Sequence, residues 1–375
     1  DFRDPTGARQ KKQFPTKAQA TEYLSKADFA IREGTFRKSA EKMTVEQVAK
    51  QYLEHLKGRY KRGENVTRHY LKCVQGYYRN YILATKSTES HPYATPFAEG
   101  IGGLKLSHVT KATVGDFRDR MRDAGVGVVT TRKVLNSLKA MFTFAIDKNW
   151  IATNPVLKVR GIGTRAEQEM EKREAPPKWL VRAILAEARE VKRPATRAKL
   201  VAAITLAVAT GIRASEMKGL RWGHIMFNKR EITVETRIDA YGEEDGLTKS
   251  AAGHRTLPLG LDAIETLRAW KEVTLFPNHF DFVIPNKVGG PVAHDYLRKK
   301  LFYPLFERLA VKFSSDPSSF PEEPERYTWH ELRHFAISTW IEQKLSIKTV
   351  MTWAGHASIQ MTMERYGHLF KSDDD

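Results

Sequence analysis

The chain has 375 residues, which predicts two or three domains with cores that need neither disulfides nor metals for stability. Its 62 lysines and arginines stand against 44 aspartates and glutamates, giving a formal charge of +18 and a pI near 9.7. Such an excess favours a polyanionic partner, most often nucleic acid, over a generally basic soluble protein.

Cysteine content and hydropathy exclude two further classes. The single cysteine, Cys73, cannot form a disulfide framework within the chain and is typical of a reducing cytoplasm. The longest apolar run, residues 200–212, is too short to span a bilayer and predicts a buried helix. No signal peptide is visible, so we expect no membrane partner.

Residues 1–43 begin with a basic segment, GARQKKQF, followed by a predicted helix from Thr16. The apolar residues of this helix share one face, namely Ala20, Tyr23, Leu24 and Ala27. They are too few for an independent core, so this segment is interpreted as a small appended module.

Residues 44–158 are predicted to be all-helical. Thr44 is a candidate N-cap for a helix with Val45, Val48, Tyr52 and Leu56 on one face. The later stretch TTRKVLNSLKAMFTFAIDKNW carries an apolar stripe of Val134, Leu138, Met141, Phe142 and Ala145. Basic residues lie among them: Arg132, Lys133 and Lys139. They are a solvated face of a helical bundle or, as the total charge favours, a surface for DNA backbone.

A charged stretch poor in apolar residues, 159–178, is predicted to be a linker because it ends in two prolines. A mixed domain follows over residues 179–375. Its helices run to about residue 212, and REITVETRIDAYGEEDGLTKSAAGHRTLPL then predicts short strands broken by glycine turns. Helices fill the remainder.

The segment HELRH, residues 330–334, supports two interpretations. H-E-x-x-H on a helix is a zinc-protease pattern, but the third ligand of its extended form is missing. Thr328 and Glu331 also form a capping box, which gives Glu331 a structural role. In the second interpretation, His330 and Arg333 lie on one helical face and bind a phosphate.

Other parts of a phosphodiester site are candidates elsewhere. Arg213 follows a helix that is predicted to end at Gly211, with Ser215 capping the next helix. Lys249 lies near a turn between the predicted strands. His356 follows a helix stop at Gly355, Ser358 can cap the last helix, and that helix carries Tyr366.

Together these pieces resemble the tyrosine recombinase family of phage-type integrases. The first arginine motif of that family, T-G-x-R-x-x-E-x-x-x-L-x-W, is matched by Thr210, Gly211, Arg213, Glu216, Leu220 and Trp222. His330 and Arg333 match H-x-x-R, Gly355 and His356 match the G-H motif, and Tyr366 matches the nucleophile. Lys249 matches the hairpin lysine, with Lys229, Lys271 and Lys287 as weaker rivals.

The resemblance implies a mainly α fold with a small antiparallel β-sheet. It implies a helical core-binding, SAM-like domain at 44–158, a mixed α/β catalytic domain at 179–375, and a partial arm-type DNA-binding module at 1–43. A prokaryotic or phage-encoded, cytoplasmic, nucleoid-associated recombinase would then act as a tetramer on double-stranded DNA attachment sites. An excisionase and a DNA-bending host protein are its expected accessory partners.

The resemblance also implies a mechanism. Arg213 and Arg333 would hold the phosphate oxygens, His356 would donate to the same phosphate, and Tyr366 would attack to form a 3′-phosphotyrosine. His330 is the candidate base and Lys249 the candidate acid. Glu216 would hold its helix or orient His330. No cofactor, metal or ATP is needed.

Three alternatives remain open at this point. A topoisomerase uses the same phosphotyrosine, a DNA-binding regulator would lack catalysis, and a zinc peptidase would use the H-E-x-x-H residues. A separate core-binding domain and the short spacing from His356 to Tyr366 favour the recombinase.

Overall fold

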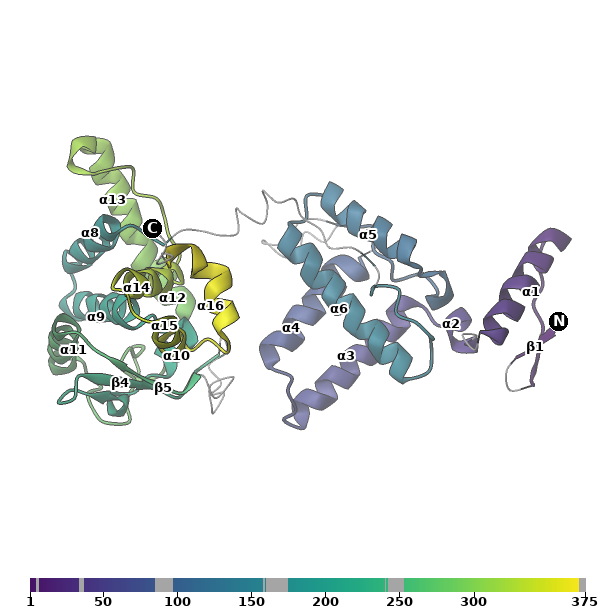
Figure 1. Cartoon of the computed structure of the whole chain (residues 1–375), viewed down its shortest axis with the longest axis horizontal. Helices are drawn as coiled ribbons and strands as arrows, with labels where there is room; N and C mark the ends of the chain where they lie inside the picture. The colour runs from purple at the N-terminus through teal and green to yellow at the C-terminus, as the bar shows by residue number, and fades with distance from the viewer. Residues whose placement is uncertain are drawn as a thin grey trace. The chain divides into compact units, whose positions relative to one another are not determined.

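The structure is a computed structural model that describes residues 1–4, 7–33, 37–84, 97–157, 159, 175–239, 241 and 253–370. Helices joined by loops dominate it, with a small antiparallel sheet, which confirms the predicted fold class (Figure 1). The chain divides into two compact units, residues 1–171 and 172–375. The finer division into 1–43, 44–158 and 179–375 stays a prediction, and most of the predicted linker at 159–178 lies outside the described residues.

The first unit begins with a hairpin of β1 (Phe2–Arg3) and β2 (Arg9–Gln10). Its α-helices are α1 (Lys17–Arg32), α2 (Lys38–Lys42), α3 (Val45–Lys61), α4 (Arg68–Tyr77), α5 (Lys111–Asp123) and α6 (Val128–Asp147). A π-helical turn, η1 (Tyr78–Ile82), continues α4, and a 3-10 turn, η2 (Leu106–His108), precedes α5.

The predicted helix starts of the first unit are confirmed. The Thr44 side chain accepts a hydrogen bond from the Gln47 backbone N–H, and the Gln47 side chain accepts one from the Thr44 N–H. Thr16 caps α1 through a single hydrogen bond, which its side chain accepts from the Gln19 backbone N–H. The α1 face is less buried than expected, because Ala27 is buried whereas Leu24 is exposed.

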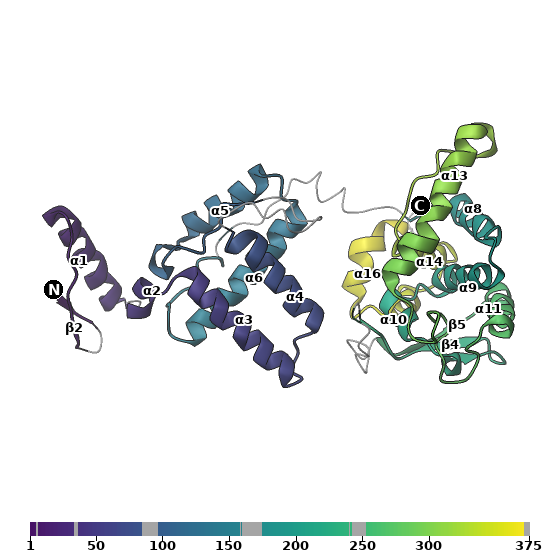
Figure 2. The ribbon, with the colours of Figure 1, turned by 180° about the vertical axis from the view of Figure 1, so that it is seen from behind.

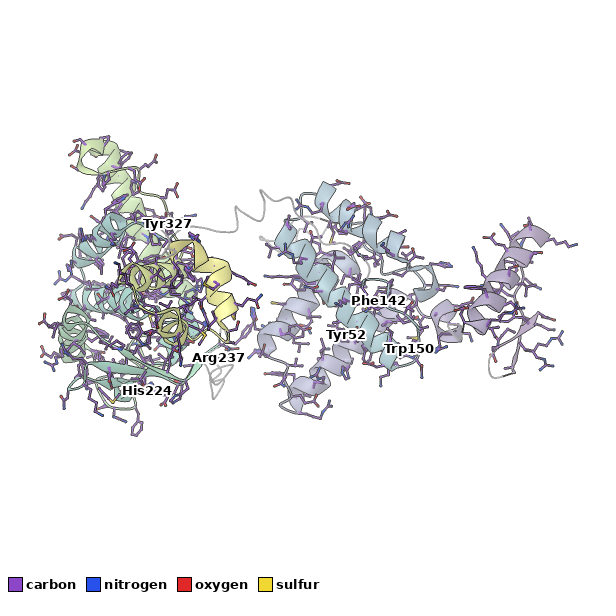
Figure 3. All side chains as sticks on the ribbon, in the orientation of Figure 1. Tyr52, Phe142, Trp150, His224, Arg237 and Tyr327 are labelled. Carbon is purple, nitrogen blue, oxygen red and sulfur yellow. The ribbon has the colours of Figure 1, made fainter. Side chains whose placement is uncertain are left out.

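The core of this unit lies between α3, α4, α5 and α6. The four predicted face residues of α3 and the five of the α6 stripe are all buried. Figure 3 shows Tyr52 and Phe142 among these helices, with Trp150 just beyond α6. The ring of Phe144 bridges Tyr52 and Trp150, with ring centroids 5.5 Å and 5.7 Å away.

The second unit is built around α9 (Pro194–Thr210), which packs against α8 (Lys178–Arg189), α11 (Leu261–Val273) and α14 (Glu331–Glu342) (Figure 2). Its other helices are α10 (Ala214–Gly219), α12 (His294–Tyr296), α13 (Tyr303–Ser315), α15 (Ile347–Ala354) and α16 (Ile359–Tyr366). Shorter turns are η3 (Trp222–His224), η5 (Leu297–Phe302), η6 (Pro317–Ser319) and η7 (Gly367–Leu369).

The sheet of the second unit has the order β3 (Ile225–Met226), β4 (Glu231–Val234) and β5 (Arg255–Pro258), all antiparallel. Ile232 lies opposite Leu257, and both are buried on the face toward the core. The apolar run at 200–212 forms the buried part of α9, as predicted, and the turn at Gly211 and Ile212 that follows it. Within the part of the chain that is described, no helix combines the length and the apolar character needed to cross a membrane.

Candidate active site

Two glycines end the helices that frame the site. Gly211 has φ 56° and ends α9, and Gly355 has φ 62° and ends α15. This left-handed conformation suits glycine because it has no Cβ. A Cβ on Gly211 would also lie 3.2 Å from the Trp340 ring and 3.3 Å from the Ala336 methyl group. Both predicted helix ends are confirmed, and each leaves backbone carbonyls without a partner inside the helix.

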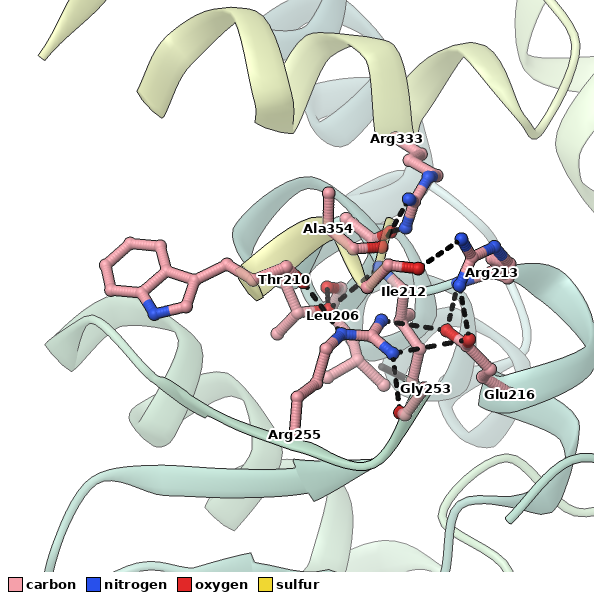
Figure 4. A network of polar contacts seen from close by, with 12 residues as sticks. Leu206, Thr210, Ile212, Arg213, Glu216, Gly253, Arg255, Arg333 and Ala354 are labelled. Atoms are coloured by element: carbon pink, nitrogen blue, oxygen red, sulfur yellow. Dashed lines mark hydrogen bonds and ion pairs between the residues drawn. The ribbon is translucent and has the colours of Figure 1, made fainter. Parts of the chain in front are cut away.

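The carbonyls at these helix ends hold Arg333. Its guanidinium donates to the Gly211 carbonyl at 2.6 Å and also to the Ala354 carbonyl, so one side chain joins the ends of α9 and α15 (Figure 4). Arg333 is 4% exposed. Burial, together with the charge of Arg213, lowers the pKa of Arg333 to about 9, which leaves it charged at neutral pH.

Arg213 lies at the start of α10 and approaches the same stretch of backbone. It donates to the Gly355 carbonyl at 2.8 Å and to the Glu216 carboxylate at 2.7 Å. Because Arg333 is held by Ala354 and Arg213 by Gly355, successive carbonyls fix the two guanidiniums. The prediction that Ser215 caps α10 is wrong. The helix begins at Ala214, and the Glu216 carboxylate accepts a hydrogen bond from the Arg213 backbone N–H at 3.0 Å.

Glu216 is the buried anchor of this cluster. It forms an ion pair with Arg213 and a second one with Arg255 of β5, whose nitrogen lies 2.8 Å from the carboxylate. Burial alone would raise the pKa of Glu216, but the hydrogen bonds and charges of Arg255 and Arg213 outweigh it and lower the pKa to about 2. Glu216 therefore holds two arginines and the start of α10.

Sequence analysis missed Arg255. Its side chain is 1% exposed and also donates to the carbonyls of Trp353 and Gly253. Its sequence context, an arginine at the start of a short strand, carries no signal that distinguishes it from a surface residue. A buried carboxylate needs a cationic partner, so only the predicted burial of Glu216 could have suggested one.

Two histidines lie around the arginines. His330 precedes α14, and His356 follows the Gly355 turn and shares a 2.8 Å hydrogen bond with buried Thr362. Burial, reinforced by the charges of Arg333 and Arg213, lowers the pKa of both histidines to about 4. Both rings are therefore neutral at pH 7, and neutral imidazole can donate a hydrogen bond or accept a proton.

Tyr366 is the last residue of α16, whose start Ser358 caps through the Met361 N–H, as predicted. The Tyr366 side chain is 4% exposed, and its ring stacks parallel to that of His356 with centroids 6.5 Å apart. Its hydroxyl shares a hydrogen bond with Nδ1 of His334. Burial raises the pKa of Tyr366 to about 12, although the charges of Arg333 and Arg365 oppose this.

The H-E-x-x-H residues are engaged in other contacts. The Glu331 carboxylate accepts a hydrogen bond from the Thr328 N–H, as the capping box predicted, although α14 begins only at Glu331. His334 faces Tyr366. Among the described residues, no group of three or more histidine, cysteine, aspartate or glutamate side chains has a geometry suited to a metal ion.

The remaining predicted site residues lie elsewhere. Lys249 lies outside the described residues. Arg132, Lys133 and Lys139 are exposed on α6 of the first unit. The structure thus brings together Arg213, His330, Arg333, His356 and Tyr366. Two guanidiniums, two neutral imidazoles and a phenol are groups suited to binding and attacking a phosphodiester.

Comparison with known proteins gives a consistent match. Residues 180–373 match the phage integrase family. The chain is 24% identical over 322 residues to a tyrosine recombinase XerC-like protein of Caldanaerobacter subterraneus subsp. tengcongensis, which covers 79% of this chain and 73% of that protein. It is 23% identical over 275 residues to the ICEBs1 integrase of Bacillus subtilis, covering 71% of this chain and 68% of that protein.

Solved structures share the fold. The Tn1549 transposon integrase in complex with transposon right end DNA matches with a TM-score of 0.61 and 22% identity, over 88% of this chain and 96% of that one. A lambda integrase tetramer bound to a Holliday junction matches with a TM-score of 0.60 and 18% identity, over 100% of this chain and 94% of that one.

These matches define the class of protein: it is a tyrosine recombinase, an enzyme that cleaves and rejoins DNA strands. The family match spans more than half of the residues, and the chain belongs to the phage integrase family. Its function is site-specific DNA recombination.

Proposed function

We propose that the chain is the integrase of a mobile element such as a prophage or genomic island, and that Tyr366 is its nucleophile. The observation that carries this proposal is that the C-terminal end of α15 holds both arginines. The carbonyls of Ala354 and Gly355 hold Arg333 and Arg213, and the next helix carries Tyr366. A phosphate held by the two arginines would therefore lie beside the element that carries the phenol.

The reaction would be two successive phosphoryl transfers. Oη of Tyr366 attacks the scissile phosphorus, the bond from phosphorus to the 5′-oxygen breaks, and a 3′-phosphotyrosine forms. A 5′-hydroxyl from a second strand then attacks this ester and releases the tyrosine. The ester keeps the bond energy, so rejoining needs neither ATP nor metal. Lys249 would protonate the departing 5′-oxygen as general acid.

Charge stabilisation would come from groups that are already in place. The transition state carries its negative charge on the non-bridging oxygens, and Arg213 and Arg333 supply planar donors to them. His356, neutral and fixed by Thr362, would add a further hydrogen bond. Because carbonyls and Glu216 hold the guanidiniums before DNA arrives, little reorganisation is needed when it binds.

We also propose that the chain acts on double-stranded attachment sites as a tetramer. The lambda integrase of similar fold is a tetramer on a Holliday junction, and the Tn1549 integrase is bound to transposon end DNA. The exposed basic side chains Arg132, Lys133 and Lys139 of α6 are the proposed contacts to the DNA backbone. An excisionase and a DNA-bending host protein would set direction.

A covalent-complex assay tests the proposal. The protein is mixed with duplex DNA that carries the element ends in EDTA, quenched with SDS, and examined for protein attached to the 3′ end. We expect an adduct with the wild-type chain and none with Tyr366→Phe, which removes one hydroxyl. Loss of the adduct in EDTA, or an adduct with the variant, would contradict the proposed chemistry.

A second assay separates an integrase from a topoisomerase. Two duplexes with different attachment sites are incubated together, and the products are scored for exchanged flanks. An integrase yields recombinant duplexes, whereas a topoisomerase reseals each duplex without exchange of flanks.

A further inference from the structure

One histidine contacts the proposed nucleophile and has no role in the mechanism so far. His334 lies on α14 directly after Arg333, and its Nδ1 shares a hydrogen bond with Oη of Tyr366. The two rings lie 5.7 Å apart between centroids. Both side chains are buried, at 5% and 4% exposure, so water does not compete for this contact.

His330, the base expected from the family resemblance, is less well placed. Its ring lies edge-on to the His334 ring, with centroids 5.0 Å apart. Within the described part of the chain, the hydrogen bond to the Tyr366 hydroxyl comes from His334 and not from His330. A general base must lie within hydrogen-bond reach of the proton that it removes, and His334 meets this condition before DNA binds.

Titratable groups face His334 from three places. Arg333 lies on α14 and His330 just before it, Arg365 and Tyr366 lie on α16, and His356 lies in the turn after α15. Burial, with the charges of Arg365 and Arg333, lowers the pKa of His334 to about 3. The ring is therefore neutral at pH 7, which is the form that can accept a proton.

We propose that His334 is the catalytic base that accepts the phenol proton of Tyr366 during cleavage and returns it during rejoining. The inference rests on the proposed role of Tyr366 as nucleophile. It assigns the base to the neighbour of Arg333 rather than to His330.

The proton balance is complete. As Oη of Tyr366 bonds to phosphorus, its proton passes to Nδ1 of His334, and the 5′-oxygen leaves with a proton from the general acid. In rejoining, the incoming 5′-hydroxyl gives up its proton to that acid group. The tyrosine oxygen leaves phosphorus and recovers its proton from His334. No oxidant, reductant or co-reactant is needed.

Substrate binding would strengthen the base. The cations around His334 make protonation of its ring costly, and a phosphodiester between the arginines brings a negative charge that offsets them. The ring would thus become more basic when the scissile phosphate is in position. A histidine that merely satisfied a buried hydroxyl would show no such link to the reaction rate.

The first test measures the rate of adduct formation against pH. The substrate is an attachment-site duplex nicked just 3′ of the scissile phosphate, so that the short 5′-hydroxyl fragment diffuses away and cleavage cannot reverse. In His334→Asn, the amide keeps a polar atom near the Nδ1 position but cannot hold a proton. We expect it to cleave about 10²- to 10⁴-fold more slowly at pH 7.

The shape of the profile separates a base from a structural partner. Without a base, the His334→Asn rate should rise with pH as the phenol ionises on its own, while the wild-type rate levels off. The matched variant His330→Asn should keep the wild-type profile shape. A His334→Asn rate within about threefold of wild type, or a changed profile in His330→Asn alone, would overturn the proposal.

Nitrogen NMR of the wild-type chain with labelled histidine provides a second test that needs no substitution of His334. The base form requires a bare Nδ1 and a proton on Nε2. His334 is identified as the histidine whose Nδ1 resonance changes in Tyr366→Phe, and we expect that histidine to show this tautomer in the wild type. A proton on Nδ1 of that histidine would overturn the proposal, even if His334→Asn proved too unstable for kinetics.

The outcomes also separate this inference from the proposed function. An adduct that persists in Tyr366→Phe, or is absent from the wild type, would contradict the proposed role of Tyr366 as nucleophile. An adduct that needs Tyr366 but forms normally in His334→Asn removes only the base assignment.

Discussion

Arg255 and Glu216 form a buried ion pair in which the arginine side chain is 1% exposed and the glutamate side chain is 4% exposed. Two guanidinium nitrogens of Arg255 reach the two carboxylate oxygens, at 3.3 Å and 2.8 Å. The same carboxylate holds Arg213, so a strand residue outside the reacting groups supports an arginine that the proposed mechanism uses.

Removing Arg255 should destabilise the second unit strongly. In Arg255→Met the Glu216 carboxylate stays buried with one cation in place of two, and breaking a buried pair costs about 3–5 kcal/mol. Urea denaturation should show this loss in the free energy of unfolding. As a matched control, Lys178→Met breaks the exposed pair with Glu342 and should change it by less than about 1 kcal/mol. Equal effects of the two substitutions would contradict this interpretation.

Much of this site could be predicted because its signals are local. Glycines mark the ends of α9 and α15, Ser358 marks the start of α16, and the spacing of His330 and Arg333 follows from one helical turn. The arrangement of side chains from distant elements could not be predicted. The pair of Arg255 with Glu216 and the contact of His334 with Tyr366 depend on tertiary packing.

The wrong prediction concerns the start of α10. Ser215 has a good N-cap side chain, and local propensity favours it. In the structure the Glu216 carboxylate accepts hydrogen bonds from the Arg213 N–H and the Arg213 guanidinium, so the helix begins at Ala214, two residues earlier than a Ser215 N-cap would place it. A capping box between Arg213 and Glu216 thus takes the place of the predicted Ser215 cap.

Lowering the pH below about 6.5 should destabilise the second unit. His330 and His356 have pKa values of about 4 and His334 of about 3 in the folded chain, against about 6.5 when unfolded. Between about pH 6.5 and 4 the unfolded chain binds protons that the folded chain excludes, so stability falls as the pH is lowered. The melting temperature should be steady from pH 8 to 7 and decrease below pH 6.5.

A variant provides the control for this pH dependence. His356→Asn keeps a polar partner for Thr362 but removes one titrating group. Its melting temperature should decrease less steeply with acid than that of the wild type. Identical slopes would show that His356 titrates normally in the folded chain.

The role of Lys249 can be tested with a modified leaving group. Replacing the 5′-bridging oxygen of the scissile phosphate by sulfur gives a leaving group that needs no proton. Lys249→Ala should therefore cleave the normal substrate slowly, by about 10²- to 10⁴-fold, and recover on the sulfur substrate. Substitutions of the rival lysines Lys229, Lys271 and Lys287 should show no such recovery. Recovery in one of these instead would move the acid to that residue.

The basic side of α6 should contribute to DNA affinity through charge. Arg132 and Lys139 are exposed and seven residues apart, on the same side of the helix. In Arg132→Gln/Lys139→Gln, the salt dependence of binding should weaken by about 0.9 in slope for each phosphate that the variant no longer neutralises. Lys50→Gln/Lys57→Gln removes two lysines at the same spacing on α3 that are paired with glutamates. This control should bind nearly as the wild type does, and equal reductions in slope would argue against a specific role for α6.

The end of α15 has a mechanical consequence. The backbone that holds Arg333 and Arg213 continues through one short turn into the helix that bears Tyr366. The proposed nucleophile and two of the backbone carbonyls that hold the phosphate-binding arginines therefore lie on one continuous segment, from Ala354 to Tyr366. A displacement of this segment would move Tyr366 and would also remove one backbone contact of each arginine, leaving Arg213 on Glu216 and Arg333 on the Gly211 carbonyl.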